Sequence, residues 1–90
     1  MLANIAYEYY RLDEALAHYR RALEDAPEGT RDWVLAHQMT ADTLVQLAWR
    51  DPERILYHAS TALPHLEPSD EWAVTLGGYI DRAKTLLSGS

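Results

Sequence analysis

The fold class is indicated most clearly by one stretch, LDEALAHYRRALEDAP, at residues 12–27. Its apolar positions recur in steps of three and four: Leu12, Ala15, Leu16, Tyr19, Ala22, Leu23 and Ala26. Such spacing places apolar side chains on one face of an α-helix. The breakers Pro27 and Gly29 follow directly, so the stretch predicts an amphipathic helix that ends before Pro27.

Upstream of this stretch the chain is again helical in pattern. Residues 1–10 are apolar at Leu2, Ile5, Ala6, Tyr9 and Tyr10, which predicts a separate first helix over 1–10. No stretch of the chain alternates apolar and polar residues as a strand would. Ninety residues allow a single domain. We therefore expect one all-α domain over 1–87, with 88–90 as a tail.

Downstream, three more helices are predicted from their start and stop signals. Thr30 is placed to cap one helix, Asp51-Pro52 to open the next, and Pro68-Ser69-Asp70 to open the last. Pro64 should end the middle one near Ala62 or Leu63. Their predicted core stripes are Val34, His37, Ala41, Leu44, Val45 and Ala48; then Ile55, Leu56, Ala59, Ala62, Leu63 and Leu66; then Ala73, Leu76, Ile80, Ala83 and Leu87.

An internal repeat underlies these helices. The segment DEALAHYRRAL at 13–23 recurs in looser form as ERILYHASTAL at 53–63. His18 and His58 occupy the same place in the two copies. Repeats of this length indicate a stack of helix pairs in which each pair buries its apolar face against the next.

The first copy resembles the tetratricopeptide repeat (TPR) family. The family's Leu and small residue match Leu2 and Ala3, and its aromatic residue matches Tyr19. The remaining matches are alanines and a proline of the second helix: Ala15, Ala22 and Pro27. The resemblance implies a five-helix antiparallel α-α repeat, a right-handed superhelix of two helix pairs and a C-terminal capping helix. An unrelated five-helix bundle whose alanine spacing mimics a repeat is the alternative.

The chain departs from the family pattern at its turns. Where the family has a turn Gly, this sequence has Tyr10 in the first copy and Arg50 in the second. The two copies are also further apart than the usual repeat of about 34 residues. Arg50-Asp51-Pro52-Glu53-Arg54-Ile55 is similar to the turn of longer variants found in bacterial regulators.

Composition excludes several classes of function. Fourteen Asp and Glu against eight Lys and Arg give a net charge of −6, with an acidic excess in both halves of the chain. Neither nucleic acid nor an anionic membrane is an expected partner of such a chain. There is no Cys, no basic n-region at the start, and no apolar run of about 18 residues. We expect a cytoplasmic protein.

Catalytic motifs are also missing from the sequence. It contains no Gly-x-x-x-x-Gly-Lys, His-Glu-x-x-His or Gly-x-Ser-x-Gly pattern. The four His are not spaced as a ligand set, and His37 falls on an apolar stripe, as a hydrogen-bonded core histidine would. We expect no enzyme activity, no metal and no cofactor. If any histidine titrates functionally, it should be His37, whose burial would lower its pKa.

The resemblance implies a binding groove, because the first helix of each pair lines a concave face in this family. Carried over by position, and adjusted to the apolar stripe of the third helix, the groove residues are Asn4, Tyr7, Glu8, Gln38, Asp42 and Gln46. Asn4 matches a groove Asn that can hold a peptide backbone by its amide. Glu8, Asp42 and the net charge favour a neutral or basic peptide or protein partner.

A structural role is the second hypothesis. Residues 1–10 and the last predicted helix both have wide apolar faces, the latter extended by Trp72, Tyr79 and Leu86. Exposed faces of this kind favour pairing. The chain would then be a self-associating fragment of a larger helical-repeat array, as in a bacterial regulator, and would form a homodimer.

Overall fold

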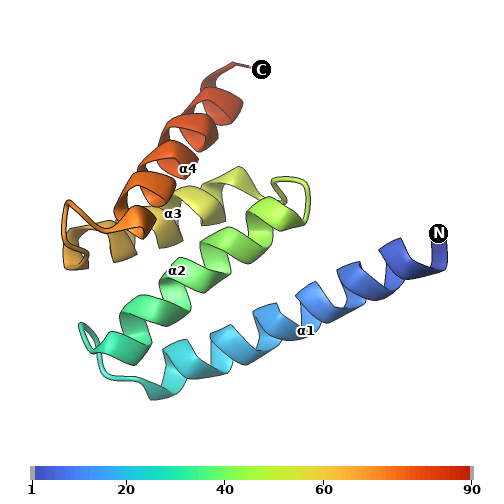
Figure 1. Cartoon of the computed structure of the whole chain (residues 1–90), viewed down its shortest axis with the longest axis horizontal. Coiled ribbons are helices and arrows are strands. Elements are labelled where there is room, and N and C mark those ends of the chain that lie inside the picture. Colours follow the sequence, from blue (N-terminus) through green and yellow to red (C-terminus); the bar gives the residue numbers. More distant parts are fainter. Residues whose placement is uncertain (1, 90) are drawn as a thin grey trace.

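The computed structural model describes the backbone of residues 2–89 and the side chains of residues 11–89 (Figure 1). This part of the chain is all-helical, with four α-helices and one short 3-10 turn. The elements are α1 (Leu2–Asp25), α2 (Arg31–Gln46), α3 (Pro52–Ala62), η1 (Leu63–His65) and α4 (Glu71–Ser88). The all-α expectation is confirmed.

The predicted number of helices is wrong. The helices expected at 1–10 and 12–26 are a single helix, α1, which runs from Leu2 to Asp25 without interruption. Tyr10, Arg11 and Leu12 lie at the junction of the two predicted segments, and none of them is a Gly or Pro that would break the backbone hydrogen-bond ladder. The described chain therefore has four helices rather than five, and α1 is not a helix pair.

The later helix boundaries agree with the start and stop signals. Thr30 caps α2 by accepting a hydrogen bond from the backbone N–H of Trp33, and Asp70 caps α4 through Trp72. Asp51 caps α3, and Pro52 occupies its first turn. These side chains satisfy backbone N–H groups that have no partner within the helix.

Pro64 sets the end of α3. The α-helix stops at Ala62 and continues for one 3-10 turn over Leu63–His65. Proline lacks the N–H that the next helical hydrogen bond would need, and its ring clashes with the preceding turn. The predicted end near Ala62 or Leu63 is confirmed.

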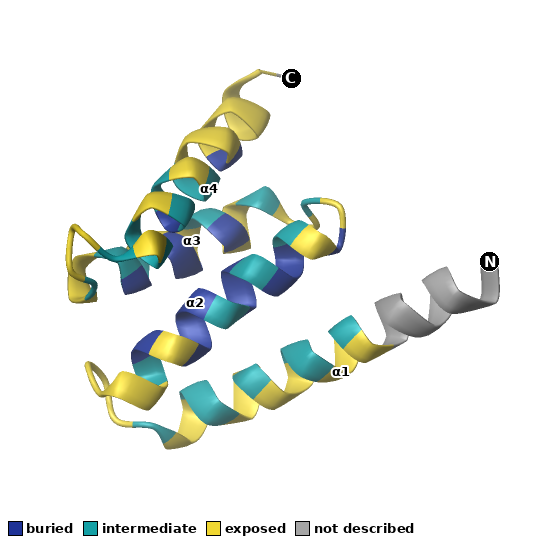
Figure 2. Cartoon of the chain, in the orientation of Figure 1, coloured by how far each residue is buried: buried dark blue, intermediate teal, exposed yellow. Residues whose placement is uncertain are grey.

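Each helix packs against the next one along the chain, and α4 also reaches α2 (Figure 1). α2 carries the largest number of buried residues, whereas no described residue of α1 is fully buried (Figure 2). The largest fully buried side chains are Leu44 on α2, Ile55 on α3 and Leu76 on α4. The core therefore lies between α2, α3 and α4, and α1 covers one side of α2.

Small residues allow these helices to approach closely. Ala41, Ala59, Ala62 and Ala83 are completely buried between helices. Alanine at a crossing lets two helix backbones come together without a large side chain between them. These alanines all belong to the predicted stripes, which are confirmed at these positions.

The stripe prediction fails at Leu87, which is 40% exposed near the end of α4, and at Ala48. α2 ends at Gln46, and Ala48 is exposed in the loop that follows. Three non-glycine residues of this loop, Ala48, Trp49 and Asp51, have positive φ angles of 61°, 58° and 56°. The chain turns sharply here because the N–H of Trp49 bonds to the carbonyl of Val45 and that of Arg50 to the carbonyl of Leu44. These two nested bonds satisfy carbonyls in the last turn of α2 that have no partner within the helix.

Candidate functional site

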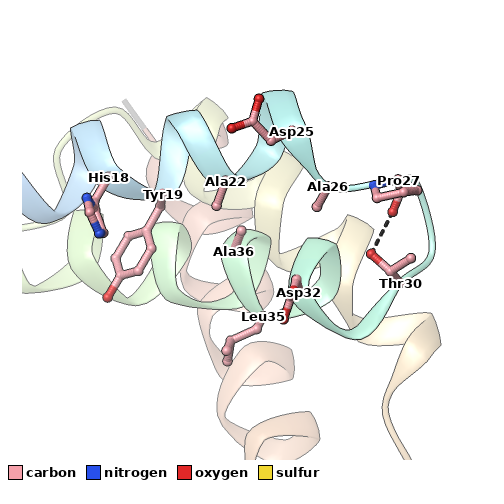
Figure 3. A pocket seen from close by; sticks show the side chains of 10 residues that line it. All are labelled: His18, Tyr19, Ala22, Asp25, Ala26, Pro27, Thr30, Asp32, Leu35 and Ala36. Atoms are coloured by element: carbon pink, nitrogen blue, oxygen red, sulfur yellow. Dashed lines mark hydrogen bonds between the residues drawn. The ribbon is translucent and has the colours of Figure 1, made fainter.

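A hollow of about 520 Å³ lies between α1 and α2. We call it the α1–α2 groove. Figure 3 shows the residues that line it: His18, Tyr19, Ala22, Asp25, Ala26, Pro27, Thr30, Asp32, Leu35 and Ala36. Ala22 on α1 and Ala36 on α2 point toward each other across the floor (Figure 3). The groove exists because neither of these two short side chains fills the space between the helices.

The rim of the groove is acidic. Asp25 at the end of α1 and Asp32 in the first turn of α2 are both exposed. Thr30 lies between them, but its hydroxyl donates a hydrogen bond of 2.7 Å to the carbonyl of Pro27. The two carboxylates therefore provide the charge of the rim, beside walls that are mostly apolar.

Leu35 forms a ridge between this groove and a second hollow. It is 47% exposed, although leucine is among the residue types most often found inside proteins. The second hollow encloses about 390 Å³ on the other side of Leu35, where α2 meets the start of α4. Its lining includes Val34, Gln38, Leu66 and Trp72. A bound segment that covers Leu35 would contact both hollows.

Three of the predicted groove residues lie on α2. Gln38 is buried, with 6% of its surface exposed, and lines the second hollow. Asp42 is half-buried, and Gln46 is exposed. The side chains of Asn4, Tyr7 and Glu8 lie outside the described residues.

Asp42 holds two helices together. One of its carboxylate oxygens accepts a hydrogen bond of 2.7 Å from the hydroxyl of Tyr79 on α4, and the other accepts one of 2.7 Å from Nε2 of Gln46. Burial raises the pKa of Tyr79 to about 12, and the hydrogen bond to Asp42 contributes to the rise. Asp42 is thus a structural link between α2 and α4 as well as a surface charge.

Sequence reasoning did not select the main residues of the α1–α2 groove. Leu35 belongs to none of the predicted core stripes or groove residues, and Tyr19 falls on the predicted apolar stripe of residues 12–26. A signal was present, because Leu35 lies on the otherwise polar side of α2 that also carries Asp32 and Asp42. Single exposed apolar residues are common on protein surfaces, so this signal alone did not identify the groove.

A second feature is a cluster of aromatic rings between α2 and α3. Nδ1 of His37 lies 2.8 Å from Nδ1 of His58, both side chains are buried, and the two nitrogens share a hydrogen bond. Trp33 and Tyr57 pack edge-on against His37, with ring centroids 4.5 and 5.8 Å away. One imidazole must donate from Nδ1 and the other must accept, so the two rings are different tautomers. The expectation that His37 is a hydrogen-bonded core histidine is confirmed.

Both histidines of this pair are harder to protonate than in water. Burial lowers the pKa of His58 to about 4, with further contributions from His37 and Arg54. Burial also lowers the pKa of His37, and the nearby His65 adds to the effect. The pair is therefore neutral at pH 7, because desolvation penalises the charged imidazolium.

Within the described part of the chain, no group of three or more His, Asp or Glu is arranged to hold a metal ion. None of the described helices is long and apolar enough to cross a membrane.

A scan against protein-family models, a search of curated proteins and a search of solved structures each returned no match.

Proposed function

We propose that this chain is a protein-interaction module that binds a neutral or basic peptide segment in the α1–α2 groove. The observation that carries the proposal is Leu35, an exposed leucine that lines two hollows, one of which is also lined by Asp25 and Asp32. An apolar side chain of the partner would bury its surface against Leu35 and Tyr19. A basic side chain next to it would meet the acidic rim.

The arrangement of α2, α3 and α4 supports a TPR-like reading of residues 31–88. α2 and α3 form a helix pair joined by the Asp51-Pro52 turn, and α4 packs on α3 and reaches α2 as the next repeat's first helix would. α1 then takes the place of the second helix of a preceding repeat. On this proposal the right-handed superhelix begins in α1 with the first copy of the repeat, at residue 13. The chain then acts by binding rather than by catalysis.

A peptide-display selection tests the proposal, because it needs no known partner. We expect selected peptides to combine an apolar anchor with neutral or basic residues. Leu35→Asp should weaken their binding by at least about tenfold, since it places a charge where the anchor is buried. Leu87→Asp is the matched control, because Leu87 is also an exposed leucine, at 40%, and lies on α4 away from the groove. Equal binding by the two variants would contradict the proposal.

The acidic rim gives a separate test. Asp25→Lys with Asp32→Lys should slow association with a basic selected peptide and reduce the dependence of the rate on salt. Glu67→Lys with Glu71→Lys changes the net charge equally at exposed positions that do not line the groove. If both pairs of substitutions slow association to the same extent, the change in net charge explains the slower rate, and the rim carboxylates have no specific role.

Self-association is a second candidate function, favoured by exposed apolar residues at two places on α4. Val74 is 73% exposed in the first half of the helix, and Leu86 and Leu87 are exposed near its C-terminal end. In a longer array another helix would pack here. Sedimentation at several hundred micromolar tests this candidate: a dimer that dissociates on Val74→Lys supports it, and a monomer at that concentration rejects it.

A further inference from the structure

A second pocket, on a different side of α1 from the α1–α2 groove, has the opposite charge. It encloses about 360 Å³ where α1, α2 and α3 meet. Its lining residues are Leu16, Arg20, Leu23, Thr40, Arg54 and His58, and we call it the arginine pocket. Two arginines and an imidazole thus surround one hollow in a protein whose net charge is −6.

The two arginines are not neutralised by the chain. Arg20 on α1 and Arg54 on α3 are exposed, and neither has an ion-pair partner among the described side chains. Arg50 shows the contrast, because its guanidinium lies 2.6 Å from the carboxylate of Asp13. An adjoining hollow shares Arg20 and Arg54 and adds Arg21, with Glu24 as its one carboxylate. The guanidinium groups of Arg20 and Arg54 therefore remain available to a ligand in the pocket.

His58 adds a third polar group at the base of the pocket, and it donates from Nε2 in the tautomer whose Nδ1 accepts from His37. Only 7% of the residue is exposed, and its Nδ1 is engaged by His37. No side-chain nitrogen or oxygen of residues 11–89 is both sealed from solvent and without a partner. Since Nε2 of His58 has no partner in that part of the chain, it reaches the open volume of the pocket. The hydroxyl hydrogen of Thr40 is committed to the carbonyl of Ala36, 2.6 Å away, so Thr40 does not donate there.

We propose that the arginine pocket binds a doubly charged oxyanion, a phosphate or sulfate group, through the guanidinium groups of Arg20 and Arg54 and Nε2 of His58. Guanidinium forks match the oxygens of such groups and remain charged at every physiological pH. Two fixed positive charges balance a dianion and over-balance a carboxylate. The proposal is independent of the α1–α2 groove, which lies on another side of α1.

Binding should be linked to protonation of His58. The titratable groups around it are Arg20 on α1, His37 on α2, and Arg54 and Tyr57 on α3, with His65 of η1 next to His37. The positive charge of Arg54 contributes to the low pKa of His58, after burial and together with His37. A bound dianion would offset that charge and raise the pKa of His58, so its affinity should increase as the pH falls.

The test follows the ring signals of the histidines by NMR in the intact chain. Sulfate is the first probe, because its charge does not change over the pH range in which His58 titrates. Sodium chloride and sodium methanesulfonate at the same ionic strength are the comparison salts, because both anions stay singly charged over this range. We expect sulfate to raise the pKa of His58 by about half a unit or more, a threefold change in proton affinity. An equal shift in methanesulfonate, or no shift beyond that in chloride, would overturn the proposal.

Variants locate the effect. Arg20→Gln with Arg54→Gln should abolish the response to sulfate, and Arg20→Gln alone should reduce it. Arg82→Gln is the matched control, because it removes one exposed arginine from α4, outside the pocket. The histidine ring signals also show whether the double variant is folded. A folded double variant that still responds fully to sulfate would contradict the assignment of the binding site to the arginine pocket.

The histidine ring signals at pH 8, where inorganic phosphate and phenyl phosphate are both dianions, distinguish the source of the anion. A stronger response to phenyl phosphate than to inorganic phosphate would assign the pocket to an organic phosphate whose apolar part contacts Leu16 and Leu23. An equal response would assign it to the free ion.

Discussion

Ala48 is in a backbone conformation that does not suit alanine. Its φ angle of 61° lies in the left-handed region, where a side chain crowds the following carbonyl. Trp49 shares this conformation, but its ring packs against Tyr79, with centroids 5.8 Å apart. Ala48 is exposed and has no such compensation.

Ala48→Gly should therefore stabilise the protein, by about 0.5–1 kcal/mol, because glycine adopts positive φ without the steric cost. Ala17→Gly is the control with the opposite sign: Ala17 is also exposed but lies within α1, where glycine costs about 0.5–1 kcal/mol. Urea unfolding measures both changes. A loss of stability in Ala48→Gly comparable to that in Ala17→Gly would contradict the loop geometry.

The His37–His58 pair makes stability depend on pH. The pKa of His58 is about 4 in the folded protein, against an ordinary value of 6.5, so between these values the unfolded chain binds a proton that the folded protein does not. The contribution of the neutral pair to stability is complete above pH 6.5 and is lost as the pH falls toward 4. A shift of this size corresponds to at most about 3 kcal/mol.

His58→Gln should lower the free energy of unfolding most at pH 7, and its difference from the wild type should shrink as the pH falls to 4. His18→Gln is the control, because His18 is exposed. Urea unfolding in chloride buffers between pH 4 and 7.5 measures the differences. A His58→Gln curve that runs parallel to the wild-type curve would show that the pair does not titrate as described.

At the scale of helices, the link between Asp42 and Tyr79 joins α2 to α4. Tyr79→Phe removes the hydroxyl that donates to Asp42 and leaves this half-buried carboxylate with Gln46 alone. The expected cost is about 0.5–1.5 kcal/mol. Tyr57→Phe should cost much less, because Tyr57 is 60% exposed. Thermal unfolding compares the two variants, and equal costs would mean that the hydroxyl of Tyr79 contributes nothing beyond that of an exposed tyrosine.

Helix ends were predictable where the chain carries a chemical signal for them. Thr30, Asp51-Pro52, Pro64 and Asp70 each satisfy or remove particular backbone hydrogen bonds, so local sequence was sufficient. The break expected near Tyr10 had no such signal and came from interpreting the apolar residues of 1–10 as a separate helix. The helix α1 continues through this position, because the local sequence contains no Gly or Pro that would end it.

Contacts between helices were not predictable in the same way. Periodicity placed His37 on a buried stripe, but its partner His58 lies 21 residues away on another helix, and only the packing of α2 on α3 joins them. The α1–α2 groove likewise depends on Ala22 and Ala36 facing each other across two helices (Figure 3). One-dimensional spacing shows which side of a helix is apolar but not which residues meet.

At the scale of the whole molecule, charge is distributed over two surfaces of opposite sign, one acidic and one basic. The α1–α2 groove has an acidic rim formed by Asp25 and Asp32, and the arginine pocket presents Arg20 and Arg54 on another side of α1. A basic segment and an oxyanion could therefore be bound at once without competing. α1 lines both sites, so its packing on α2 sets the shape of each.

The most direct test of the interaction-module proposal is to map a bound peptide on the molecule. A peptide obtained by selection would be titrated into isotope-labelled protein, and backbone amide shifts followed by NMR. The proposal predicts the largest changes at the residues around Leu35, from Tyr19 on α1 to Gln38 on α2, with small changes in the second half of α4. Changes concentrated around Leu86 and Leu87 on α4 instead would contradict it.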